Sequence, residues 1–168
     1  AVVKPGNGGS SLGIAIVSDA DSLKKQYEIA TQYDPDVMAE QYIEGKEFSI
    51  AVLGEQLLPA IQLHTSRQFF DFDAKYIDKG TNIICPPDLS ENKLRELDEL
   101  ALKAYQSLDC EGLARVDVMQ DQDESFFLLE VNTVPGMTSH SFVPMAANQA
   151  GMDFDELLLR ILECELNK

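Results

Sequence analysis

Residues 112–131 read GLARVDVMQDQDESFFLLEV. Two runs rich in apolar residues flank an acidic tip at 121–125, a pattern typical of an antiparallel β-hairpin. Because side chains alternate along a strand, Arg115 and Asp117 share one face and the intervening apolar residues face the other way. The hairpin is therefore predicted to carry charge on one face and an apolar surface on the other.

The returning strand alternates in the same way and places Glu130 and Asn132 on one face. A tip centred at Asp123 and Glu124 fixes which residues of the two strands oppose each other. The predicted pairs are Asp117 with Glu130, Arg115 with Asn132, and Val116 with Val131. Polar residues then oppose polar ones and apolar residues oppose apolar ones, so a single register satisfies both faces.

Two carboxylates directly opposed on a sheet lie about 5 Å apart and repel each other. Arg115, a shifted pKa or a divalent cation would each compensate for this repulsion. Asp117, Glu130 and Asn132 offer the hard oxygen ligands that Mg²⁺ prefers when phosphates complete its shell. The residues alone leave two interpretations open, a metal site and a structural network of arginine and carboxylates.

Outward from the hairpin, apolar residues recur at helical spacing or alternate at strand spacing. The long segment at 64–87 is polar, aromatic and irregular, and loops of that length commonly carry function, so it is a candidate binding loop or lid. Helices are predicted at 18–32, 90–108, 141–149 and 154–166, and strands at 14–17, 37–43, 48–53, 57–63, 112–120 and 126–131.

The chain opens on a short apolar strand at 1–5 that has no partner strand before it, and we expect its hydrogen bonds to a partner to be missing. A Gly- and Ser-rich loop at 6–13 follows and leads to the next strand, which is the pattern of a hairpin. Gly8, Gly9 and the serines after them suit either a flexible turn or a loop whose backbone amides close on phosphate.

Other polar residues are equally open to two interpretations. Lys75 and Tyr76 suit a solvent-facing loop as well as a binding site. Glu40 and Glu47, seven residues apart, suit a solvated strand edge.

Composition excludes several classes of protein. The 168 residues carry a formal charge of −16, which argues against nucleic acid or an anionic membrane as the main partner. The three cysteines are scattered and odd in number, so neither a disulfide framework nor a zinc site is expected. No stretch has the length and apolar character of a membrane span or a signal peptide, and a cytoplasmic location is expected.

Four ordered motifs resemble those of D-alanine–D-alanine ligases, which are ATP-grasp enzymes. The motifs are KPGNGGSSLG at 4–13, FDAKY at 72–76, GLARVDV at 112–118 and LEVNTVPGMTSHS at 129–141. The resemblance extends from about Val2 to Leu166.

The resemblance implies an α+β ATP-grasp fold in which the nucleotide lies between two antiparallel sheets. It implies a partial central lobe at 1–45 and a C-terminal catalytic lobe at 46–168. Family members carry a further N-terminal domain and the first half of the central domain, so the chain is expected to be a fragment.

The resemblance also assigns residues to the nucleotide. Lys4 approaches the adenine and the α-phosphate, and Glu40 binds the adenine amino group. The backbone at Gln41 and Ile43 frames the base, and Glu47 takes the ribose hydroxyls.

Further residues are assigned to the phosphates, the metal and the amino-acid substrates. Asp117, Glu130 and Asn132 match the ligands of two Mg²⁺ ions, for which Mn²⁺ is an alternative. Ser10, Ser11 and Lys75 match residues near the γ-phosphate, and Tyr76 matches a residue that ties the loops together over the site. Arg115 and the Gly136 amide match the groups that stabilise the oxyanion. Ser141 and Phe142 match the residues that receive the second D-alanine. Two positions depart from many relatives, Phe70 where they carry Tyr and Gly8 where some carry an acid.

The implied reaction joins two D-alanines through an acyl phosphate, at the expense of ATP, for peptidoglycan synthesis. The alternatives are another ATP-grasp carboxylate–amine ligase, such as one making glutathione or D-alanyl–D-lactate, and a non-catalytic nucleotide-binding module. The expected partners are small molecules, with a homodimer in the full-length enzyme. This chain alone is expected to be inactive and, through its unpaired first strand, prone to associate.

Overall fold

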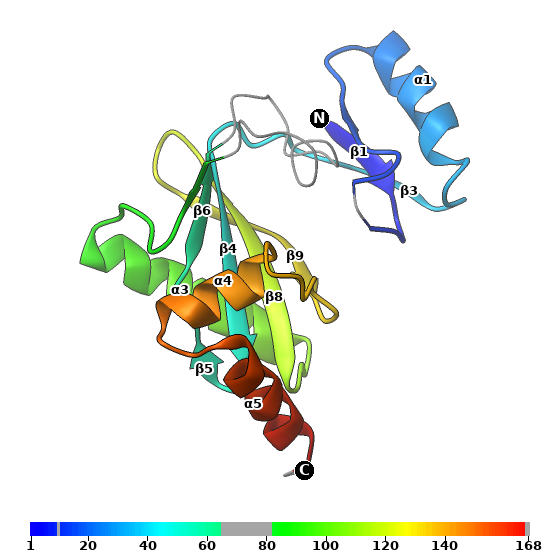
Figure 1. Ribbon diagram of the computed structural model, residues 1–168. Helices are drawn as coiled ribbons and strands as arrows, with labels where there is room; N and C mark the ends of the chain where they lie inside the picture. The colour runs from blue at the N-terminus through cyan, green and yellow to red at the C-terminus, as the bar shows by residue number, and fades with distance from the viewer. Residues whose placement is uncertain (10, 65–81, 167–168) are drawn as a thin grey trace. The chain divides into compact units, whose positions relative to one another are not determined.

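The computed structural model describes residues 1–9, 11–64 and 82–166 (Figure 1). Within this part, the chain divides into two compact units, and the boundary in the sequence lies between Ile43 and Glu44. We call residues 1–43 the N-terminal unit and residues 44–64 with 82–166 the C-terminal unit. The sequence-based boundary lay after Gly45.

The described part of the N-terminal unit contains a three-stranded antiparallel sheet in the order β2-β1-β3. The expected hairpin is confirmed, because Val2 pairs with Ile16. The expectation of an unpartnered first strand is wrong, since β1 is the central strand and β3 covers its other side. The elements are β1 (Val2–Pro5), β2 (Ala15–Ile16), α1 (Ala20–Ala30) and β3 (Val37–Glu40).

Helix α1 begins at a capping box. The Asp19 side chain accepts a hydrogen bond from the Ser22 backbone, and the Ser22 side chain accepts one from the Asp19 backbone. Among the described residues, the core of this unit contains Val3, Val17 and Ala30, with Val37 packed against it.

The C-terminal unit is built on a sheet that, over its described residues, has six antiparallel strands. The main order is β7-β6-β4-β8-β9, and β5 pairs with β4. The strands are β4 (Lys46–Leu53), β5 (Gln56–Leu57), β6 (Ile61–His64), β7 (Asn82–Ile84), β8 (Leu113–Gln120) and β9 (Phe126–Asn132).

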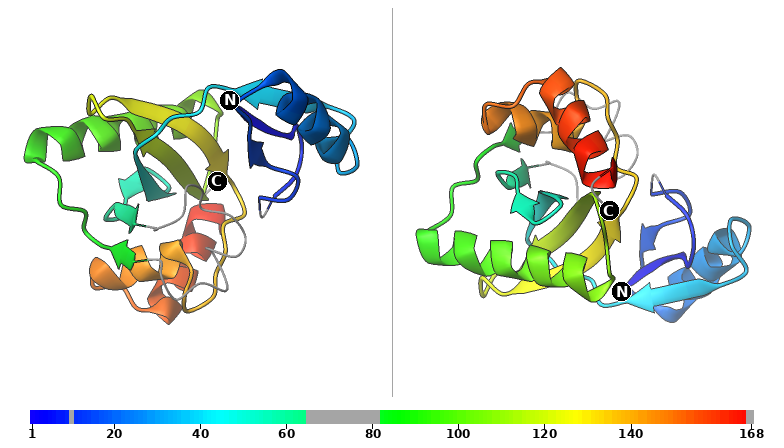
Figure 2. Two further views of the ribbon diagram at one scale, coloured as in Figure 1. Left: turned by 90° about the horizontal axis from the view of Figure 1, so that it is seen from above. Right: turned by 90° about the horizontal axis from the view of Figure 1, so that it is seen from below.

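Helices cover both faces of this sheet. Figure 2 shows α3 (green) on one face, with α4 and α5 (orange and red) on the other. The core under α3 includes Phe48, Ile50 and Val52 of β4, together with alternate residues of β8. The helices are α3 (Glu91–Ser107), α4 (Phe142–Gln149) and α5 (Phe154–Leu166), close to the predicted bounds.

Two predictions about strands are corrected. The single strand predicted at 57–63 is two short strands, β5 and β6, because Pro59 has no N–H to donate to a sheet ladder. Strand β7 lies in the segment that was expected to be irregular, and its three residues are too few to give an alternating pattern.

The β8–β9 hairpin has the predicted register at its charged end, where Asp117 pairs with Glu130. Towards the tip a β-bulge shifts the pairing by one residue, so that Val118 pairs with Leu128. The three predicted pairs are confirmed, whereas the bulge displaces the predicted centre of the tip at Asp123 and Glu124, since Gln120 pairs with Phe126. Phe126 and Val131 both pack against the α3 core although five residues separate them. An odd spacing reaches the same face of a strand only with one extra residue, which the bulge provides.

None of the helices in the described part has the length and apolar content that crossing a bilayer requires.

Candidate functional site

The charged face of the β8–β9 hairpin points away from α3. Alternate residues of β8, namely Ala114, Val116 and Val118, belong to the α3 core, so Arg115 and Asp117 point to the face that α4 and α5 cover. In the ladder Arg115 opposes Asn132 and Asp117 opposes Glu130. The structure thus brings these four predicted residues together on one face.

Asp117 is buried and accepts hydrogen bonds from two strands. Arg115 donates through Nε to Oδ1 at 2.9 Å and through Nη2 to Oδ2 at 2.7 Å. Ser49 of β4, directly opposite Asp117 in the ladder, donates its Oγ hydroxyl to Oδ1 at 2.8 Å. The Asp117 carboxylate is therefore held by a planar, charged fork along its own strand and by a neutral hydroxyl from the neighbouring strand.

Arg115 lies among several acidic groups. Its Nη2 is 4.0 Å from Glu130 Oε1. Burial lowers the pKa of the guanidinium, but the hydrogen bond and charge of Asp117 and the charges of Glu130 and Glu47 outweigh burial, so the net pKa is raised. The guanidinium also lies 5.8 Å from the centre of the Phe142 ring, a cation–π contact that ties β8 to the start of α4.

The segment after β9 turns sharply towards α4. Asn132 Oδ1 accepts a hydrogen bond from the Val134 backbone N–H at 3.0 Å. A side chain at Gly136 would meet Ser141 Oγ at 2.9 Å, so the close approach there favours glycine. Ser141 Oγ also accepts the Thr138 backbone N–H at 3.0 Å and lies 2.9 Å from Thr138 Oγ1. These contacts fix Gly136 and Ser141 beside each other, as one wall before α4.

The donor set at the hairpin fits Mg²⁺ chemically. A carboxylate has about four acceptor positions, and Asp117 accepts four described hydrogen bonds from Ser49 Oγ, Arg115 Nε and Arg115 Nη2, so a cation on its oxygens would compete with these donors. Glu130 directly opposes Asp117 and its side chain is 55% exposed. Asn132 adds an amide oxygen, and these are all hard oxygen ligands. Within the described residues, no group of three or more His, Cys, Asp and Glu side chains converges as a metal site, so the fit rests on two carboxylates and an amide.

In the N-terminal unit, Lys4 and Glu40 form an ion pair. Lys4 of β1 pairs with Met38 of β3, which puts Glu40 on the same face one diagonal step away. Lys4 Nζ lies 2.7 Å from Glu40 Oε1. Sequence reasoning selected both residues without predicting their contact.

The Gly-rich loop is anchored by its neighbour at 34–36. The Gly6 N–H donates to the Asp36 carbonyl, and the Asn7 N–H donates to Asp34 Oδ2 at 2.8 Å. Asp34 is buried, and its hydrogen bonds from the Asp36 backbone and from Asn7 lower its pKa. A side chain added at Gly8 or Gly9 would meet no atom of the described residues within 4 Å.

The remaining predicted residues are placed as follows. Gln41 and Ile43 lie in the irregular connection between β3 and β4, Glu47 lies in β4 and Ser11 in the Gly-rich loop. Ser10, Phe70, Lys75 and Tyr76 lie outside the described residues.

Sequence reasoning missed Ser49, Thr138 and Asp34. The available signal for Ser49 was a single hydroxyl in the otherwise apolar run Phe48-Ser-Ile-Ala-Val. Thr138 and Asp34 stand among other turn residues, and their sequence context does not distinguish them.

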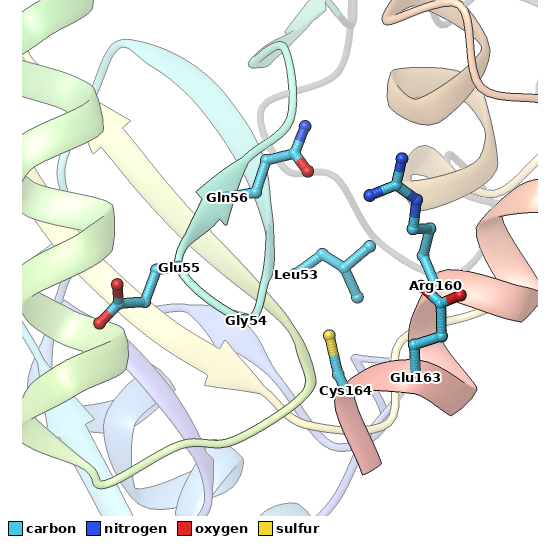
Figure 3. A pocket seen from close by; sticks show the side chains of 7 residues that line it. All are labelled: Leu53, Gly54, Glu55, Gln56, Arg160, Glu163 and Cys164. Atoms are coloured by element: carbon cyan, nitrogen blue, oxygen red, sulfur yellow. The ribbon is translucent and has the colours of Figure 1, made fainter. Parts of the chain in front are cut away.

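A pocket of about 380 Å³ lies between the β4–β5 turn and α5 (Figure 3). Its lining residues are Leu53, Gly54, Glu55, Gln56, Arg160, Glu163 and Cys164. It contains none of the predicted site residues, so the candidate site is defined by the hairpin.

The family model for the C-terminus of D-Ala–D-Ala ligases matches residues 1–163 of this chain. The chain belongs to the D-alanine–D-alanine ligase family. A D-alanine–D-alanine ligase of Saccharophagus degradans is 51% identical over 160 residues, which cover 95% of this chain and 51% of that protein.

Solved structures give the same result. The chain resembles the D-alanine–D-alanine ligase of Bacillus anthracis with a TM-score of 0.86, at 37% identity over 99% of this chain and 54% of the ligase. The same ligase complexed with ATP gives a TM-score of 0.84 at 36% identity, over 99% of this chain and 53% of that one. A D-Ala:D-Ser ligase of Enterococcus faecalis gives 0.85 at 32% identity, over 97% of this chain and 48% of that one.

These comparisons confirm the predicted family and its α+β ATP-grasp fold with antiparallel sheets. The chain spans about half the length of the relatives it matches.

Proposed function

We propose that this chain serves in an ATP-dependent ligase that joins two D-alanines, and that it contributes nucleotide-binding and phosphoryl-transfer residues. The observation that carries the proposal is the opposed pair Asp117 and Glu130 beside Arg115, in a chain that belongs to the D-alanine–D-alanine ligase family. A ligase of this family from Bacillus anthracis has been solved complexed with ATP, which supports ATP as the nucleotide.

In the N-terminal unit, Lys4 and Glu40 are proposed to contact the nucleotide. Glu40 holds the Lys4 ammonium at 2.7 Å, so the lysine is oriented before a phosphate arrives. Its positive charge then offsets phosphate charge, which is the main requirement of phosphoryl transfer. We further propose that the backbone at Gln41 and Ile43 frames the adenine, and that Ser11 lies near the terminal phosphate with Ser10 and Lys75.

In the C-terminal unit, Asp117, Glu130 and Asn132 would hold Mg²⁺, with Mn²⁺ as an alternative. A bound divalent cation supplies positive charge next to the transferring phosphoryl group. Glu47, on β4, is proposed to take the ribose hydroxyls.

Arg115 and the Gly136 amide are proposed to stabilise the oxyanion that forms when the second amine attacks the acyl phosphate. Arg115 is positively charged at neutral pH, as arginine side chains in proteins are. The Phe142 ring and Asp117 restrict where the guanidinium lies, so that less reorganisation is needed during reaction. Ser141 and Phe142 are proposed to border the second substrate.

Tyr76 is proposed to favour an amine over a hydroxyl as the second substrate. In a full-length ligase that contains this chain, in competition between D-alanine and D-lactate, Tyr76→Phe is expected to form more depsipeptide than the parent. An unchanged product ratio would remove Tyr76 from this role.

The main test uses this chain and a chimera in which it replaces the matching half of the Saccharophagus degradans ligase. The chimera is expected to release phosphate only with ATP, Mg²⁺ and D-alanine together. Asp117→Asn should lower kcat/KM by about 10²–10³, on the order of 2.7–4 kcal/mol. Phosphate release that is unaffected by Asp117→Asn across a Mg²⁺ titration would contradict the metal assignment.

The chain alone is expected to give no ligation, because it matches only about half of the relatives' length. D-alanine-dependent turnover by the isolated chain would refute this. A cytoplasmic location and a homodimeric ligase are also proposed, and fractionation and analytical ultracentrifugation test them.

A further inference from the structure

Ser49 is a buried hydroxyl on the site face of a strand whose other buried residues are apolar. It is 3% exposed and lies in β4 between Phe48 and Ile50, both fully buried in the α3 core. Its own side chain points to the opposite face, as alternation requires. A hydroxyl buried there without a hydrogen-bond partner would destabilise the fold, so the identity of its acceptor is informative.

That acceptor is the Asp117 carboxylate. The two residues are directly paired in the β4–β8 ladder, and Ser49 Oγ donates to Oδ1 at 2.8 Å. Arg115 also contacts Asp117, but it comes from the same strand two residues away. The arginine and the carboxylate can therefore move together, whereas the Ser49 bond fixes the carboxylate to the buried part of a neighbouring strand.

The two donors respond differently to a cation. The Arg115 guanidinium is positive, so a divalent cation that binds Asp117 and Glu130 repels it and competes with it for the same oxygens. The Ser49 hydroxyl is neutral, so a cation on the carboxylate does not repel it, and the bond strengthens the orientation of the ligand.

We propose that Ser49 is a positioning residue that keeps the Asp117 carboxylate oriented when it takes a divalent cation. It acts through Asp117 and touches neither nucleotide nor substrate. The inference rests on the proposed metal-binding role of Asp117, Glu130 and Asn132.

The test is the affinity of the full 168-residue chain for Mn²⁺, followed by the electron paramagnetic resonance signal of free Mn²⁺ in the presence of a non-hydrolysable ATP analogue. Ser49→Ala is expected to weaken Mn²⁺ binding by about tenfold, the low end of what losing a partner of a metal ligand costs. Ser49→Thr and Ser49→Val form a matched pair with the same shape, of which only Thr keeps the hydroxyl. Thr should bind Mn²⁺ within about twofold of the parent, and Val should behave like Ala.

A control separates this effect from a general loss of stability. Tyr105→Phe removes another buried hydroxyl of the same unit, which donates to the Gly112 carbonyl at 3.0 Å. It is expected to lower the melting temperature without changing the Mn²⁺ affinity. Melting curves of every variant show whether it is folded at the temperature of the titration.

The outcomes distinguish the inference from the proposed function. If neither the parent nor any variant binds Mn²⁺ with the analogue, the metal site is wrong and the inference falls with it. If Asp117→Asn abolishes binding while Ser49→Val binds like Ser49→Thr, the metal site stands and the role of Ser49 is refuted. If Ala and Val weaken binding alike while Thr and Tyr105→Phe do not, the positioning role is supported.

Discussion

Both units place a basic side chain beside a carboxylate, Lys4 with Glu40 across antiparallel strands and Arg115 with Asp117 along one strand, but the two clusters differ in charge balance. Lys4 and Glu40 form a neutral pair whose side chains are 18% and 31% exposed. Arg115 meets two carboxylates, and its side chain and that of Asp117 are only 15% and 9% exposed. The first cluster is balanced in charge, whereas the second carries surplus negative charge and contains both a buried carboxylate, Asp117, and an exposed one, Glu130, at 55%.

This difference assigns the clusters different tasks. The Lys4–Glu40 pair is balanced in charge, so we expect either partner to exchange its contact for a ligand at small cost. The Arg115 cluster has more carboxylates than cations, and a second cation would relieve its surplus charge. The comparison therefore predicts a readily opened contact in one unit and a cation-dependent structure in the other.

The largest expected effect comes from Arg115→Met, which leaves two opposed carboxylates without their counter-ion. The free energy of unfolding should fall by roughly 3–5 kcal/mol in urea denaturation. Added Mg²⁺ should restore more stability to this variant than to the parent, because the cation no longer competes with the guanidinium. Lys4→Met is the matched control and should cost about 1 kcal/mol or less. Equal losses in the two variants would remove the contrast between the clusters.

Phe142 provides a smaller, intermediate test. Phe142→Leu removes the ring that lies 5.8 Å from the Arg115 guanidinium and should cost about 0.5–2 kcal/mol. Phe142→Tyr keeps the ring face and should retain most of that stability. Thermal melts of both variants decide between a cation–π contact and simple packing; similar losses in Leu and Tyr would argue for packing alone.

The Lys4–Glu40 pair should show a weak coupling. In a double-mutant cycle of Lys4→Met and Glu40→Gln, the coupling energy is expected at about 0.2–1 kcal/mol and should decrease as salt is added. A coupling energy above this range that persists in high salt would show that the pair behaves as a buried ion pair.

The smallest expected change in stability comes from Asp34, a carboxylate that is stabilised by backbone N–H groups and not by a cation. Its folded-state pKa lies below the unfolded value of about 3.9. The stabilisation is therefore complete above that value and is lost as pH falls through the lower folded-state pKa. The melting temperature should drop below about pH 4, and Asp34→Asn should make that drop shallower. Asp19, whose pKa is also lowered by Ser22, accounts for part of the remaining slope.

Much of the charged hairpin was predictable because two independent patterns had to agree. Only one register opposes Asp117 to Glu130 and also Val116 to Val131, and the structure has that register. The bulge was not predictable, since it depends on Phe126 and Val131 both reaching the α3 core, which is a tertiary contact. Helices with a clear apolar face and a cap, such as α3 after Ser90, were predicted almost to the residue.

The failures share a cause, which is pairing between distant segments. The central position of β1 depends on β3, whose sequence gives no sign of its partner. Ser49 and Asp117 lie far apart in the chain and meet only because β4 and β8 pair. Family resemblance named the residues that carry charge, but the hydroxyl that holds one of them came from the structure alone.

The bulge also divides the hairpin into two parts that are held in place by different contacts. Beyond it the tip at 121–125 is largely exposed; it is held by bonds within itself, such as the Asp121 N–H to the Ser125 carbonyl, and by Lys93 Nζ of α3, which donates to the Glu124 carbonyl at 2.7 Å. Before it, Asp117 and Glu130 are aligned by β4 and by the pairs at the far end of the ladder. The tip is thus a natural insertion point for a fluorescent or affinity tag, because residues added there lengthen a loop and leave the spacing of the two carboxylates unchanged.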